Sequence, residues 1–167
     1  LLICDAERAV ALAGVMGGAD TEVRDGTSNI LLESAYFSPD TVRKTSRKTG
    51  LKSESSYRFE RLGVDPEGVV RALDRAAALI AELAGGEVAA GKIDEYPAKI
   101  EPAVVSVTAK RVNAILGTGI SEDEIISIQK RLGLELLSSD KGVLTFKVPT
   151  HRVDLTREID IIEETAR

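Results

Sequence analysis

Four carboxylates in the C-terminal part of this chain have the type and spacing to hold a cation: Asp154, Asp160, Glu163 and Glu164. The last three stand at i, i+3 and i+4 of a segment with helical periodicity, so their side chains project from one surface. Like charges this close repel one another unless a cation or a basic partner neutralises them, and hard divalent cations prefer oxygen ligands. A solvated helix face is the alternative, because arginines lie nearby.

A second candidate site combines a glycine-rich turn with an isolated carboxylate. The run Gly14-Val-Met-Gly-Gly18 has neither the spacing of a dinucleotide fingerprint nor the Lys-Ser/Thr of a phosphate-binding loop. Glycine there lets the backbone approach a ligand, or simply forms a turn. Glu33 interrupts an apolar segment, where a carboxylate is costly unless it is paired or lines a cavity. Strand alternation, which would point Glu33 outward, is the alternative.

The charge of the chain is unevenly distributed. A formal net charge of −5 excludes a global attraction to nucleic acid. However, the stretch from Arg43 to Lys52 carries basic residues and no acid. A local basic patch of this kind can contact phosphates even on an acidic protein, with a solvated helix face as the alternative.

The composition narrows the class of protein. Hydrophobic residues make up 43% of the 167 residues, which is typical of a globular chain, and no apolar run approaches the roughly 18 residues of a membrane helix. One Cys and one His exclude a disulfide framework and a Cys/His zinc site. Cys4 is expected to be a small core residue. The chain starts at Leu1 without a Met or a secretory signal, so we expect a piece of a longer, cytoplasmic protein.

These residues must be positioned by helices and strands, and the sequence pattern predicts an α+β chain of two units. The first is a mixed sheet with helices, over residues 1–95. Its predicted strands are 1–5, 9–13 and 29–37, and its predicted helices are 39–50, 53–61 and 66–84. A Pro-containing stretch, 91–102, separates it from a small winged-helix-like α+β domain over residues 101–167. There we expect a strand at 104–107, helices at 110–116 and 121–132, a hairpin of 134–138 with 143–148, and the acidic helix.

Four segments in this order resemble the β subunit of bacterial phenylalanyl-tRNA synthetase, over nearly the whole chain. They are Ala13-Gly-Val-Met-Gly-Gly18, Leu31-Leu-Glu-Ser-Ala-Tyr-Phe37, Ser-Ser-Tyr-Arg-Phe-Glu-Arg-Leu-Gly-Val-Asp-Pro from Ser55, and Pro149 to Arg167. The resemblance implies that residues 1–95 are the C-terminal half of an aminoacyl-tRNA editing domain, and that residues 101–167 are the small domain that follows it. One departure is Leu62, an extra residue between Arg61 and Gly63.

The resemblance also implies an activity and a substrate pocket. The whole enzyme attaches phenylalanine to its tRNA using ATP, and the editing domain hydrolyses tyrosine wrongly attached to that tRNA, which a phenylalanine pocket cannot reject perfectly. By this match, Ala13 and Gly14 form a pocket wall and Gly17 brings backbone close to the ligand. Glu33 accepts the tyrosine hydroxyl, and Ser55 stands where alanine is expected. No catalytic residue is assigned.

Metal and partners follow from the same resemblance. The positions of Asp154, Asp160, Glu163 and Glu164 match magnesium ligands in a site shared with the catalytic α subunit. The implied partners are that α subunit, in a heterotetramer of two α and two β subunits, and the phenylalanine tRNA, with no membrane.

Two other functions remain open on the residues alone. One is a stand-alone nucleic-acid-binding module that uses the helices within 110–132 and the hairpin after them, although Glu122, Asp123 and Glu124 would face the phosphates. The other is a structural docking module without catalysis. The lone histidine, His151, completes no recognisable catalytic triad.

Overall fold

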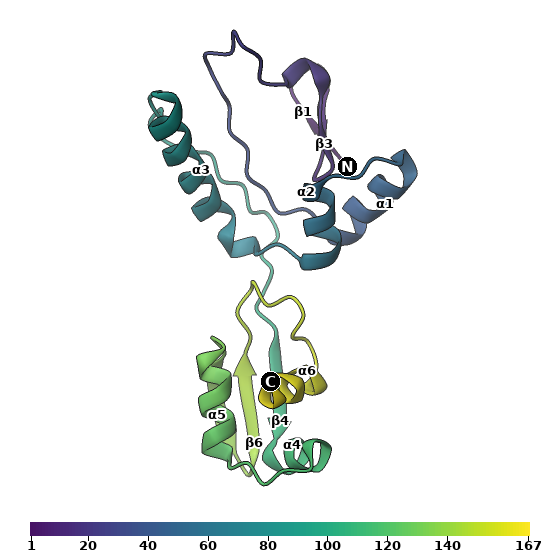
Figure 1. Ribbon diagram of the computed structural model, residues 1–167, viewed down its shortest axis with the longest axis vertical. Coiled ribbons are helices and arrows are strands. Elements are labelled where there is room, and N and C mark those ends of the chain that lie inside the picture. The colour runs from purple at the N-terminus through teal and green to yellow at the C-terminus, as the bar shows by residue number, and fades with distance from the viewer. The chain divides into compact units, whose positions relative to one another are not determined.

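The computed structural model describes residues 1–61 and 63–167 in full and the backbone alone at position 62 (Figure 1). The Leu62 side chain, and with it the effect of that departure, lies outside the described residues. The chain divides into two compact units, Leu1–Glu95 and Tyr96–Arg167. Each unit has its own three-stranded antiparallel sheet together with helices, which confirms the α+β class.

The sheet of the first unit is small and antiparallel, in the order β1-β2-β3. Its strands are β1 (Leu2–Cys4), β2 (Ala9–Leu12) and β3 (Met16–Gly17). Ala11 pairs with Gly17, so the glycine-rich run turns back along β2. The expectation that Cys4 is a core residue is wrong: it is exposed at the end of β1.

The helices of the first unit begin and end where the local sequence indicates. α1 (Pro39–Thr49) has proline in its first turn and ends at Gly50, whose φ of +72° is left-handed. α2 (Glu54–Tyr57) starts at a capping box made by Ser53 and runs on into a π-helical turn, Arg58–Leu62. A 3-10 turn, Pro66–Gly68, leads into α3 (Val69–Ala84), which ends at the left-handed Gly85.

The third predicted strand is wrong. Residues 27–38 contain neither strand nor helix. A strand needs a backbone partner, which the apolar pattern of 29–37 does not specify. The extended segment is attached to α3 instead, because the Ser34 hydroxyl donates to the Val69 carbonyl at 3.0 Å. Leu31 is 99% exposed.

The second unit packs helices on a sheet ordered β4-β6-β5, as the sequence predicts for each element. Leu144 and Phe146 lie two positions apart on one strand, so both side chains point to the same face of the sheet. They are fully buried there in the apolar core of the unit. The hairpin turns through Lys141 and Gly142, both at positive φ. The elements are β4 (Val104–Thr108), α4 (Ala109–Leu116), α5 (Glu122–Arg131), β5 (Glu135–Asp140), β6 (Val143–Lys147) and α6 (Glu158–Ala166). The winged-helix likeness stays a prediction.

A buried amide joins α5 to α6. Gln129 is fully buried, and its Nε2 donates to the Ile161 carbonyl at 3.2 Å and to the Thr165 hydroxyl at 3.0 Å. Its Oε1 has no hydrogen-bond partner among the described atoms. No helix of the described chain is both long and apolar enough to cross a membrane.

Candidate functional site

A cavity of about 300 Å³ in the first unit gathers four of the five residues predicted for the pocket. Gly14 and Gly17 reach it from the turn around β3, Glu33 from the extended segment, and Ser55 from α2. The fifth, Ala13, is 1% exposed and lies in the core, not in the cavity lining. Three segments far apart in the sequence therefore meet at one site.

The two pocket glycines are constrained differently. Gly14 has a φ of +68°, and a Cβ on it would lie 2.9 Å from the Val42 Cγ2 and 3.1 Å from ring atoms of both Phe37 and Phe59. A Cβ on Gly17 would meet no atom within 4 Å. Gly14 is thus required by backbone conformation and packing, whereas Gly17 leaves open space in the cavity.

Two phenylalanines, which the sequence reasoning missed, line the cavity. The rings of Phe37 and Phe59 lie with centroids 5.4 Å apart and planes tilted by 50°. This geometry is favourable for aromatic pairs. An aromatic ligand side chain would find an apolar surface here.

The wall that carries Ser55 is fixed by Ser53, also missed from the sequence. The Ser53 hydroxyl donates to the Val15 carbonyl at 2.6 Å and accepts from the Ser56 N–H at 3.1 Å. In return the Ser53 N–H donates to the Ser56 hydroxyl at 3.0 Å. The start of α2 is therefore tied to the glycine turn. The sequence does contain a signal for this contact: Ser53 stands three residues before Ser56 at the start of a helix, which is the spacing of a capping box.

Glu33 is the one acid in the cavity lining. Desolvation of the carboxyl group raises the pKa of Glu33 above its ordinary value. Within the described part of the chain, Glu33 makes no hydrogen bond or ion pair. Its oxygens are free to accept a hydrogen bond from a ligand. The lining contains no His or Cys, and among the residues that the structure describes no hydrogen bond joins the Ser55 hydroxyl to Glu33, so the cavity has no assembled nucleophile–base pair.

Two of the four predicted metal ligands, Asp154 and Glu164, are neutralised by one arginine. The Arg152 guanidinium makes two hydrogen bonds to Asp154, at 3.0 and 2.7 Å, and an ion pair with Glu164 at 3.0 Å. The bond from Arg152 is the main reason why the pKa of Asp154 is lowered. A fork-like guanidinium is suited to bridging two carboxylates in this way.

Asp160 serves the start of α6. It accepts hydrogen bonds from the backbone N–H groups of Thr156 at 3.0 Å and Arg157 at 2.8 Å, and from the Arg157 guanidinium at 3.0 Å. The Arg157 side chain, followed by the Thr156 N–H, lowers the pKa of Asp160. Glu163, in contrast, is exposed on α6.

These four acids do not form a metal site by themselves. Among the described residues, no three from His, Cys, Asp and Glu lie close enough together to hold a metal ion. Two of the acids share Arg152 and a third caps a helix, so the arrangement fits an internal ion-pair network better than a cation site. Magnesium binding stays a prediction of the resemblance, and no step of the function is derived through it.

The basic stretch lies on the solvent side of α1. Val42 and Ser46 are buried, while Arg43, Lys44, Arg47 and Lys48 are exposed. None of these four basic side chains takes part in the ion pairs found across the described residues. A compact positive surface is therefore available next to the cavity-forming elements.

Comparison with known proteins gives two families and a consistent set of relatives. Residues 1–85 match the B3/4 domain family, and residues 105–167 match the tRNA synthetase B5 domain family. The whole chain is 52% identical to the phenylalanine–tRNA ligase β subunit of Geobacter sulfurreducens and covers 21% of it. It is 50% identical to those of Moorella thermoacetica and Bacillus subtilis, again over the whole chain and 20% of each relative. The chain thus spans about a fifth of the length of the curated relatives it matches.

Proposed function

The chain belongs to the B3/4 domain family, and because the relatives it matches are β subunits of phenylalanine–tRNA ligase, we propose that it forms part of such a subunit and contributes its editing pocket. The whole enzyme would attach phenylalanine to its tRNA using ATP. The first unit would help to hydrolyse tyrosine mischarged on that tRNA. The observation that carries this proposal is the cavity shared by Gly14, Gly17, Glu33 and Ser55.

The cavity has the two features that a tyrosine-selective site needs. Phe37 and Phe59 offer an apolar surface for the ring, and Glu33 offers an unpaired acceptor for the hydroxyl. Phenylalanine would fill the same space but leave the desolvated carboxylate without a partner. A site built to bond a hydroxyl rejects the analogue that lacks it, because the carboxylate, which is exposed in the cavity, would be covered by the ligand and left unpaired.

Hydrolysis in this pocket would depend on positioning. The lining has no His or Cys, and His151 belongs to the other unit. The ester would be held against the glycine turn, where the backbone of Gly17 is accessible. A water would attack the ester carbonyl, the bond from the acyl carbon to the ribose oxygen would break, and the tRNA would leave with its hydroxyl restored by a proton from that water. The residues of this chain supply binding and orientation.

The decisive experiment is Glu33→Ala in the complete enzyme, with the exposed Glu54→Ala as a matched control outside the cavity. We expect the preference for releasing tyrosine over phenylalanine from tRNA to fall about 10- to 100-fold, as for loss of a hydrogen bond to a charged group. The control should keep the preference of the unmodified enzyme. Unchanged discrimination in Glu33→Ala would remove Glu33 from the specificity role.

We also propose that α1 contacts tRNA through phosphates. Its exposed basic residues carry charge without an aromatic platform, so the contact would not read sequence. Reversal of charge at Arg43 and Arg47 should weaken tRNA binding and flatten its salt dependence, by about 0.9 in log–log slope for each phosphate that is no longer neutralised. Equal affinity and slope in the variant would contradict this contact.

For the second unit we propose docking to the α subunit, in an assembly of two α and two β subunits. α6 supports this role because it presents exposed Glu163 and Ile159, the latter 46% exposed, beside its buried face. Ile159→Asp should weaken α–β association measured by sedimentation, while the melting temperature of the β subunit stays the same. Unaltered association would place the α subunit elsewhere.

A further inference from the structure

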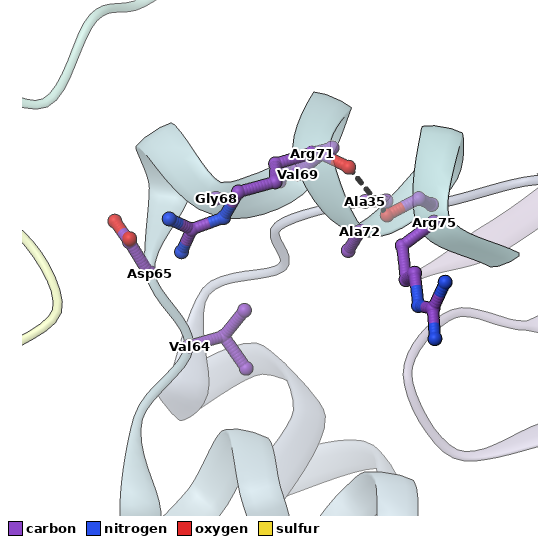
Figure 2. A pocket seen from close by; sticks show the side chains of 9 residues that line it. Ala35, Val64, Asp65, Gly68, Val69, Arg71, Ala72 and Arg75 are labelled. Carbon is purple, nitrogen blue, oxygen red and sulfur yellow. Dashed lines mark hydrogen bonds between the residues drawn. The ribbon is translucent and has the colours of Figure 1, made fainter.

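A second, larger hollow of about 560 Å³ lies between the start of α3 and the extended segment of the first unit (Figure 2). Ala35 lines both this groove and the cavity that contains Glu33. Ser34 faces the groove, whereas Glu33 faces the cavity. The two hollows are therefore adjacent, on either side of a single extended stretch of chain.

The groove carries a net positive charge, from two arginines against one aspartate, Asp65. Arg71 and Arg75 project from successive turns of α3 along its lining, on either side of Ala72 in Figure 2. Neither arginine takes part in an ion pair within the described residues. Asp74, which precedes Arg75 on α3, is already neutralised: its two carboxylate oxygens accept from the Lys92 ammonium at 2.9 and 2.8 Å.

Most of the remaining lining is apolar, and its two polar residues, Ser34 and Asp65, make hydrogen bonds to nearby backbone. Val64 and Ala72 are apolar residues of this lining, and Ala72 lies between the two arginines (Figure 2). The hydrogen bond from Ser34 to the Val69 carbonyl anchors the extended segment to the first turn of α3. The acid in the lining, Asp65, caps the 3-10 turn by accepting from the Glu67 N–H at 3.0 Å.

We propose that this groove binds the single-stranded 3′ end of an aminoacyl-tRNA, with Arg71 and Arg75 on consecutive phosphates. This inference rests on the proposed editing function, since it supplies the path that brings the ester into the neighbouring cavity. Residues one helical turn apart have Cβ atoms about 5–6 Å from each other, so the two guanidinium groups can engage separate phosphates of one strand. The apolar lining at Val64 and Ala72 can contact a ribose, and because the lining has no aromatic side chain for base stacking, the phosphate contacts carry the binding.

The test uses the complete enzyme and tyrosine-charged tRNA. Arg71→Gln/Arg75→Gln should raise the KM for tyrosine release about tenfold and leave kcat unchanged, as expected for two exposed ion pairs. The log–log salt slope of binding should fall by about 0.7 for each phosphate of a single strand that is released. Lys99→Gln, an exposed cation outside the groove, should change neither quantity. Arg71→Lys/Arg75→Lys should restore the salt slope.

Two results would overturn the inference while the editing function stands. One is an unaltered KM and salt slope in the double Gln variant of an enzyme that still loses tyrosine preference on Glu33→Ala. The other is a lowered melting temperature with the same KM, which would make the groove a packing surface for another part of the protein. Loss of the Glu33 effect itself would instead refute the proposed function.

Discussion

Replacement of Gly14 by alanine tests whether the pocket turn is built as described. The left-handed φ of +68° costs a residue with a Cβ about 1–2 kcal/mol. The new methyl group would also lie 2.9 Å from Val42 and 3.1 Å from two phenylalanine rings, and overpacking of this kind costs about 1–3 kcal/mol. We therefore expect Gly14→Ala to lower the free energy of unfolding by about 2–5 kcal/mol.

Gly17→Ala is the matched control within the same turn. Its Cβ would meet nothing within 4 Å and its backbone is not left-handed, so a cost below about 0.5 kcal/mol is expected. The added methyl group would nevertheless enter the cavity. Gly17→Ala should thus slow tyrosine release from tRNA at nearly unchanged stability.

Urea unfolding followed by circular dichroism measures both variants. A double-mutant cycle with Val42→Ala separates the two effects, because removal of the nearest side chain relieves crowding but not backbone strain. We expect a favourable coupling energy of about 1 kcal/mol between positions 14 and 42. If Gly14→Ala is no more destabilising than Gly17→Ala, the assignment of the turn is refuted.

Three further outcomes are expected. Arg152 lowers the pKa of Asp154 in the folded state, so their pairing stabilises the protein fully above about pH 4, the ordinary pKa of an aspartate in the unfolded chain. This stabilisation is lost as the pH falls through the folded-state pKa. Arg152→Gln should remove this part of the acid dependence of urea unfolding. Asp160→Asn should lower the melting temperature through loss of the α6 cap, whereas Glu163→Gln should not; equal effects would contradict the cap. The pKa of Glu33 is raised, so this carboxylate takes up a proton at a higher pH than an ordinary glutamate does. The preference for tyrosine should therefore be lost at a correspondingly higher pH when the solution is acidified, which a pH profile of release from tRNA can check.

Much of the fold follows from local signals in the sequence. Ser121 at the start of α5 and the left-handed Gly117 after α4 are short-range features, so the helices they bound were predicted nearly to the residue. The 29–37 segment failed because strand formation depends on a partner that local pattern does not encode. α2 was predicted as longer than it is, because apolar spacing does not distinguish an α-helical turn from the π-helical turn that follows it.

The candidate site was predictable in its residues but not in its contacts. Family resemblance brought Gly14, Glu33 and Ser55 together, whereas nothing in their spacing indicates a common cavity. The role of Arg152 was missed because Glu164 lies twelve residues further along the chain, and the two meet only when α6 has folded. Pairing between distant charges is decided by tertiary structure, and three of the four acids that suggested a cation in the sequence, Asp154, Asp160 and Glu164, are matched by guanidinium groups in the fold.

The buried Gln129 sets the rotation of α6 about its own axis. An apolar contact between two helices tolerates sliding by a turn, but the Nε2 donor meets the Ile161 carbonyl and the Thr165 hydroxyl in one azimuth only. The unpartnered Oε1 lowers the stability of the fold. We therefore interpret this amide as a group that fixes one orientation of α6, and not as one that adds to the free energy of folding. A leucine at this position would stay buried but would allow α6 to rotate about its axis. Such a rotation would change the direction in which the exposed Ile159 and Glu163 project.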